Sequence, residues 1–190
     1  MDKNILTNRF CGVFVCTIML FVAQAFAAWD GSATQQATNE GDYYIIDTEA
    51  KLAWYAKNYD KGNAKLTADM DLGGHLWTPI AAGKGTPSFG KIFDGNGHVI
   101  KNLYINGSEL ASIKNEYSQN LGFVGVLGGG TVKNLILENV DIQAATNAGD
   151  VTGNTTNQIS VGPFVGWMNE NGANKILDCV AASGTIRTTG

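Results

Sequence analysis

Short stretches in which apolar and polar residues alternate, separated by glycine or asparagine, make up most of this chain. In residues 66–72, leucine, alanine and methionine fall on one face and threonine and aspartate on the other. Strict alternation of this kind is typical of a half-buried strand. Residues 43–46, Tyr-Tyr-Ile-Ile, also predict a strand. The 24 glycines and three prolines fit many short strands joined by tight turns. The pattern therefore predicts an all-β fold.

One segment has the period of a helix instead. Asp47 and Thr48 form a good N-cap, and apolar residues then recur on one face as far as about Tyr59. We expect a single helix there. The preceding residues 28–42 are small and polar, and we expect them to form a loose entry segment.

Three segments resemble copies of one pattern, and a second pattern accompanies them. The copies are residues 97–105, 130–137 and 174–180, and the companions are residues 122–125 and 162–166. Self-similarity at a spacing of a few tens of residues is typical of solenoids. We therefore expect a right-handed parallel β-helix with an N-terminal strand-helix cap.

The copies also suggest how each turn of the solenoid bends. Asn102, Asn134 and Asp178 occupy equivalent places, and asparagine tolerates the left-handed bend between two faces. Stacked asparagines can form a hydrogen-bonded ladder along the coil axis. Extra length between copies maps to loops, which we expect at residues 108–120 and 143–158.

The first 27 residues are typical of an export signal. Lys3 and Arg9 precede a short apolar run, and Ala25-Phe26-Ala27 fits a cleavage site. The run is shorter than the roughly 20 residues that a spanning helix needs. We expect a signal peptide at 1–27, cleaved after Ala27 or Ala28, and no membrane association beyond it.

The repeats resemble a known family. Residues 97–105, 122–125, 130–137 and 162–166 are similar to the GLUG-type repeats of bacterial secreted and surface proteins, including filamentous adhesins and the repeat region of IgA-cleaving metallopeptidases. The most specific part is Phe-Asp-Gly-Asn-Gly-His at residues 93–98. The resemblance implies a β-solenoid over residues 43–190 at the cell exterior, secreted or on the surface. It implies no catalytic residue.

Charge and cysteine content narrow the function further. The formal net charge is −4, and loss of the leader makes the chain one unit more negative, which disfavours nucleic acid as a partner. Only Cys179 lies outside the leader, so no disulfide can form within the mature chain. Because Cys179 lies in an apolar stretch, we expect it to pack as a small hydrophobe.

The strongest candidates for chemistry are Asp69, Asp71 and Asp94. Paired carboxylates could cleave a polysaccharide, as a lyase or a glycoside hydrolase, or hold a structural Ca²⁺, with Lys91 as the basic neighbour. The simpler interpretation is that these acids form a solvated strand face. We assign no catalytic, cofactor-binding or metal residue, and no cofactor.

Aromatic side chains are the other candidates, because they can stack on sugars. They are Trp54, Tyr55, Trp77, Tyr104 and Trp167. We expect Trp54 and Trp77 to pack in the core and Trp167 to be the most exposed.

These observations favour a non-catalytic module for adhesion, ligand binding or domain presentation, with an extracellular glycan or a host or cell-surface protein as partner. Residues 183–186 resemble 139–142, and no polar capping unit follows. We therefore expect a truncated C-terminal end, continued by further C-terminal domains of a longer chain or docked to a partner.

Overall fold

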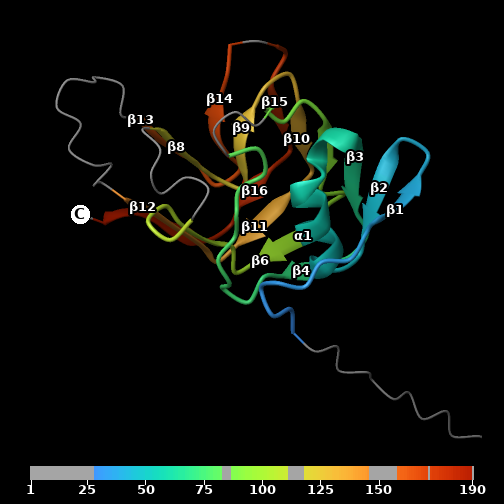
Figure 1. Cartoon of the computed structure of the whole chain (residues 1–190), viewed down its shortest axis with the longest axis horizontal. Helices are drawn as coiled ribbons and strands as arrows, with labels where there is room; N and C mark the ends of the chain where they lie inside the picture. Colours follow the sequence, from blue (N-terminus) through green and yellow to red (C-terminus); the bar gives the residue numbers. More distant parts are fainter. Residues whose placement is uncertain (1–27, 83–86, 111–117, 146–157, 171, 190) are drawn as a thin grey trace, which may run out of the picture.

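The computed structural model describes residues 28–82, 87–110, 118–145, 158–170 and 172–189. Within them the chain is mostly strands, with one α-helix and one 3-10 helix, so the predicted all-β class is confirmed (Figure 1). The predicted signal peptide at 1–27 lies outside the described residues. None of the described helices has the length and hydropathy that a membrane crossing requires.

The elements follow one another along the chain with short spacings. The N-terminal elements are β1 (Thr38–Glu40), β2 (Tyr43–Ile46), α1 (Glu49–Lys57), η1 (Tyr59–Lys61), β3 (Asn63–Leu66) and β4 (Met70–Asp71). The next are β5 (Ile92–Asp94), β6 (Val99–Lys101), β7 (Tyr104–Asn106), β8 (Ser118–Leu121) and β9 (Val124–Leu127). The next five are β10 (Thr131–Lys133), β11 (Ile136–Glu138), β12 (Val140–Ala145), β13 (Gln158–Val161) and β14 (Val165–Met168). The last are β15 (Lys175–Leu177), β16 (Val180–Ala181) and β17 (Gly184–Thr189).

The strands form five small sheets. Their orders are β1-β2-β3-β5-β10-β15, β16-β11-β6-β4, β17-β12-β7, β13-β8 and β14-β9. The β1–β2 pair is antiparallel, and every other pair of named strands is parallel. The chain visits the sheets in one order from β5 to β9 and repeats that order from β10 to β14. In Figure 1 the blue and cyan β1 and β2 lie on one side of the molecule and β8 and β13 on the other.

The core lies between these sheets. The register aligns Ala64, Phe93 and Val132 on neighbouring strands, and all three are fully buried. The Phe93 ring lies 4.9 Å from that of Phe123 and 6.2 Å from that of Tyr55, between centroids. The inward positions of successive strands therefore build one continuous apolar column.

Helix α1 forms where the sequence predicts it. Thr48 is the N-cap and its side chain accepts a hydrogen bond from the Lys51 N–H. The α-helix ends at Lys57, and Tyr59 belongs to the 3-10 turn η1. Leu52 and Tyr55 are fully buried, so the apolar face of α1 packs on the core beside β2 and β3.

The prediction of one strand over residues 66–72 is wrong, although the alternation is real. Leu66, Met70 and Leu72 are buried and Asp71 is exposed, as the pattern indicated. The chain nevertheless turns after Leu66, and β3 and β4 belong to different sheets. Inward and outward positions continue to alternate around this corner, so alternation alone does not reveal the bend.

Residues 28–42 are more ordered than the sequence predicts. They contain β1, which pairs with β2, and the Gln35 N–H donates to the Ala50 carbonyl at 3.0 Å. Trp29 is 9 % exposed and packs edge-on against His75. A buried tryptophan anchors a segment that otherwise has the composition of a loop.

The asparagine bends are confirmed, but one stacking prediction is wrong. Asn102, Asn134 and Asp178 all have left-handed backbones, with φ of 57°, 51° and 51°. The second and third repeat copies stack, since β10 pairs with β15. In the first copy, however, β6 pairs with β11 and not with β10. The same bend motif serves two different corners, and the sequence does not distinguish them.

The similarity between residues 183–186 and 139–142 does reflect stacking. The β12–β17 register places Ile186 beside Ile142. Beyond β17 no further strand covers this end within the described residues.

Candidate functional site

The three candidate carboxylates bind separate sets of partners. Asp69 Oδ1 accepts the Val99 N–H at 3.1 Å and lies 3.0 Å from His98 Nδ1. These two hydrogen bonds, that of Val99 first, lower the pKa of Asp69. Asp69 therefore ties the segment before β4 to the start of β6.

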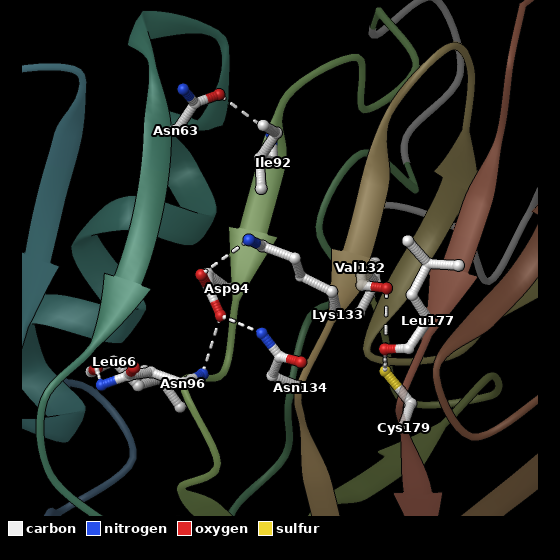
Figure 2. A network of polar contacts seen from close by, with 10 residues as sticks. All are labelled: Asn63, Leu66, Ile92, Asp94, Asn96, Val132, Lys133, Asn134, Leu177 and Cys179. Atoms are coloured by element: carbon white, nitrogen blue, oxygen red, sulfur yellow. Dashed lines mark hydrogen bonds and ion pairs between the residues drawn. The ribbon is translucent and has the colours of Figure 1, made fainter.

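Asp94 lies at the end of β5 in a polar network (Figure 2). Its oxygens lie 3.0 Å from Lys133 Nζ and accept Asn134 Nδ2–H at 3.0 Å and the Asn96 N–H at 2.9 Å. Burial raises the pKa of Asp94, but the hydrogen bonds from Asn134, Lys133 and Asn96 outweigh it, and the pKa lies below its ordinary value. The basic neighbour is therefore Lys133, on the adjacent strand, and not Lys91 as predicted.

In the described part of the chain, no partner is shared among the hydrogen bonds of Asp69, Asp71 and Asp94. No group of three or more His, Cys, Asp or Glu side chains within the described ranges is placed to hold a metal ion. The geometry thus assigns these acids to strand-to-strand bonding.

Asp71 begins a ladder of polar side chains at the corner after β4. Its Oδ1 accepts Asn102 Nδ2–H at 2.6 Å, and Asn102 Oδ1 accepts Asn139 Nδ2–H at 2.5 Å. The Asn139 N–H donates to Ser183 Oγ at 2.8 Å. The hydrogen bond from Asn102, followed by that from the Gly73 N–H, lowers the pKa of Asp71. A ladder was predicted, but its members follow the observed register rather than the repeat copies.

A hollow of about 560 Å³ lies beside this ladder, and we call it the corner groove. Its lining residues come from three successive passes of the chain: Gly73, Gly74, Asn102, Leu103, Tyr104, Asn139 and Asp141. Gly74 has φ +71°, and a Cβ there would meet nothing within 4 Å. The groove therefore stays open where its first pass bends.

The groove presents an aromatic ring, amides and a carboxylate together. Tyr104 and Asp141 are register partners on β7 and β12. The Tyr104 hydroxyl donates to Glu109 Oε1 at 3.0 Å, and Asp141 Oδ2 lies 3.0 Å from Arg187 Nη2. These contacts fix both side chains. A ring beside hydrogen-bonding groups suits a hydroxylated ligand.

The sequence did not single out Asn139, Asp141 and Arg187 as site residues. The one signal available was the likeness of residues 183–186 to 139–142, which indicates that the strands carrying them lie side by side.

Of the other aromatic candidates, Trp77 and Trp167 are placed as predicted, whereas Trp54 is only partly buried against the core. Trp77 is 2 % exposed and stacks on Phe123 at 5.6 Å between centroids. Trp54 is half-buried against Tyr44. Tyr55 is buried, and Trp167 is 43 % exposed.

Cys179 packs against the core, as predicted. It lies beside Val132 and Leu177, and its Sγ donates to the Leu177 carbonyl at 3.2 Å (Figure 2). Burial raises the pKa of this thiol, which disfavours the reactive thiolate.

The predicted loops 108–120 and 143–158 lie in large part outside the described residues. The strands that flank them are described. β7 pairs with β12 before the two segments, and β8 pairs with β13 after them. Residues 118–120 belong to β8, and residues 143–145 and 158 belong to β12 and β13, so the prediction of loops is wrong at these positions.

Comparison of the chain with protein-family models, with curated proteins and with solved structures gives no match.

Proposed function

We propose that this chain is an exported, non-catalytic β-solenoid module that binds an extracellular glycan through its corner groove. The corner groove carries the proposal, because it brings side-chain amides, a carboxylate and an aromatic ring from two successive passes of the chain beside the glycines of a third. The alternatives that such a module also allows are binding of a host or cell-surface protein and presentation of other domains.

The pairing pattern supports a right-handed parallel β-helix. From β10 onward each strand pairs in parallel with the strand one pass earlier. Residues 63–82 and Phe89 follow the same course, through β3, β4 and isolated parallel bridges at Leu76, Ile80 and Phe89. β2 and α1 would then form the N-terminal cap.

Because the strands that form the groove are parallel, equivalent side chains recur along it at a regular interval. Neighbouring strands lie about 4.8 Å apart, so Asn102 and Asn139 present hydrogen-bonding groups at that interval. An extended polymer with regularly spaced hydroxyl groups suits such a surface better than a small compact ligand.

Export rests on the N-terminal leader and on the resemblance to GLUG-type repeats of secreted and surface proteins. Asparagine and glycine at the corners keep the surface polar without adding positive charge, which fits a neutral or weakly charged glycan.

Binding is favoured over cleavage because the carboxylates have other roles. Asp69, Asp71 and Asp94 each accept two or more hydrogen bonds from neighbouring parts of the chain. An acid or nucleophile for glycoside cleavage needs a carboxyl group that faces the substrate.

The test is a glycan array and a polysaccharide pull-down with the secreted chain, reading both bound and released sugar. We expect binding without release, and loss of binding in Tyr104→Ala. The matched control is Trp167→Ala, which removes an exposed aromatic ring outside the groove. Released sugar would overturn the non-catalytic assignment. Binding that survives Tyr104→Ala, or is lost equally in the control, would overturn the groove.

A further inference from the structure

A second cavity, of about 350 Å³, shares no lining residue with the corner groove. It is enclosed by the segment 29–34, by the C-terminal half of α1 and by residues 76–78. This volume is at the low end of the range for small-molecule sites, about 300–1,000 Å³. It fits a single sugar ring or a molecule of similar size.

The first wall of the cavity is held in shape by its own hydrogen bonds. Asp30 Oδ1 accepts the N–H groups of Ser32 and Ala33, each at 2.8 Å, and Trp29 Nε1–H donates to the Ala33 carbonyl at 2.9 Å. Gly31 has φ +81°, and a Cβ there would lie 2.8 Å from His75. The segment therefore packs tightly enough to form a preorganised wall.

The lining combines apolar residues with polar edges. Trp29 and Trp77 are part of its apolar side but are only 9 % and 2 % exposed, and Ser32, Thr34 and Thr78 contribute hydroxyl groups. A mostly apolar lining with a few placed polar groups is the usual composition of a small-molecule site.

Lys57 is the single ionisable residue in this lining. No acid is among the lining residues, although Asp30 belongs to the segment that forms the first wall and the chain as a whole carries a net charge of −4. On the same helix Lys51 Nζ lies 2.8 Å from Asp47, whereas Lys57 has no ion pair among the described residues. The cavity therefore favours an anionic ligand over a cationic one.

We propose that this cavity binds a carboxylated pyranose, with the ring hydroxyl groups at Ser32, Thr34 and Thr78 and the carboxylate at Lys57. The site is separate from the corner groove. It extends the proposed glycan binding to acidic sugars without depending on the groove.

The probes are methyl glucuronide and its neutral counterpart methyl glucoside, titrated into the full secreted chain by calorimetry. We expect saturable binding of the glucuronide, and binding of the glucoside weaker by about tenfold, the value of one charge-assisted hydrogen bond. Added salt should narrow this difference.

Matched lysine variants test the carboxylate contact. Lys57→Gln should weaken glucuronide binding about tenfold and leave glucoside binding unchanged. Lys61→Gln removes the same charge just beyond the helix, outside the cavity lining, and should change neither. Equal effects of the two variants would overturn the proposal.

Filling the cavity provides a second test. Ala56 lines it from α1, and leucine retains helix propensity. Ala56→Leu should abolish binding of both sugars with little change in the thermal unfolding midpoint. Tyr104→Ala, in the corner groove, should leave glucuronide binding intact. Absence of saturable glucuronide binding to the wild type, or binding unchanged in Ala56→Leu, would overturn this site. Array binding that depends on Tyr104 would still support the groove in that case.

Discussion

The two ends of the strand stack differ in how their apolar side chains are covered. At the N-terminal end α1 packs over the core, and Leu52 and Tyr55 are fully buried. At the opposite end β15, β16 and β17 are the last strands of their sheets, and Val180 and Ile186 are 53 % and 50 % exposed. Side chains of similar type are thus buried at one end and exposed at the other.

The difference in burial is clearest for residues that are register partners on neighbouring strands. Ile142 and Ile186 are partners on β12 and β17, yet Ile142 is fully buried and Ile186 is half exposed. Leu137, likewise fully buried, pairs with the exposed Ala181. Burial at these positions therefore depends on having a neighbouring strand on both sides.

The largest expected effect comes from truncating each isoleucine of the β12–β17 pair. Ile142→Ala should lower the free energy of unfolding by about 2–5 kcal/mol. Ile186→Ala removes the same atoms from a half-exposed site and should cost about 1 kcal/mol. Urea unfolding of both variants measures the difference. Equal losses would show that Ile186 is covered in solution.

Removing one member of the asparagine ladder should have the next largest effect. Asn102→Ala loses hydrogen bonds to Asp71 and Asn139, each worth about 1 kcal/mol. It also places alanine in a left-handed conformation, at a further cost of about 1–2 kcal/mol.

Asn102→Gly separates these two contributions, because glycine accepts φ +57° freely. It should be less destabilising than Asn102→Ala by about 1 kcal/mol. If both variants unfold at the same urea concentration, backbone strain does not contribute at this corner.

A smaller, pH-dependent effect is expected at Asp94. Its pKa is lower in the folded chain than in the unfolded chain. Its contribution is therefore complete above the ordinary pKa of about 3.9 and is lost as the pH falls through the lowered folded value. Asp94→Asn should cost about 1–2 kcal/mol at pH 7 and make the acid-dependent loss of stability less steep.

Lys133→Gln is the variant to compare with Asp94→Asn, because it keeps the Asp94 carboxyl group but removes its ammonium partner. We expect a smaller acid-dependent loss in this variant than in the wild type, because without the ammonium group the folded pKa of Asp94 lies closer to its unfolded value. Unfolding curves at several pH values between 2 and 7 measure both effects, and identical slopes in all three proteins would contradict the assignment.

The smallest effect concerns Cys179, which lies between β15 and β16 at the exposed end and packs against the core. Because burial raises its pKa, alkylation at pH 8 should be about tenfold slower in the folded chain than in urea. Mass spectrometry of the peptide that contains Cys179 measures both rates. Equal rates would show that β15 and β16 open readily.

Local features of this fold could be predicted from the sequence, because they depend on neighbouring residues. These include the Thr48 cap of α1, the left-handed bends at Asn102 and Asn134, and the alternate burial of residues 66–72. Each follows from backbone sterics or from periodicity, which a single chain displays directly.

The pairing of strands could not be predicted in full. The Asn-Leu bend occurs at two different corners, so the copy that contains Asn102 was matched to the wrong neighbour. The corner groove was missed for the same reason, since Gly74, Tyr104 and Asp141 come together only when the register is known. Glycine at position 74 and asparagine at 139 are ordinary turn residues in sequence.

The most direct test of the account is the strand register, measured by backbone NOEs between β5 and β10 and between β6 and β11. The structure predicts NOEs that place Val99 beside Ile136 on β11, and Phe93 of β5 beside Val132 on β10. This register creates the asparagine ladder and the corner groove. NOEs that pair β6 with β10, as the alignment of the repeat copies alone would suggest, would contradict the stack and the proposed binding surface.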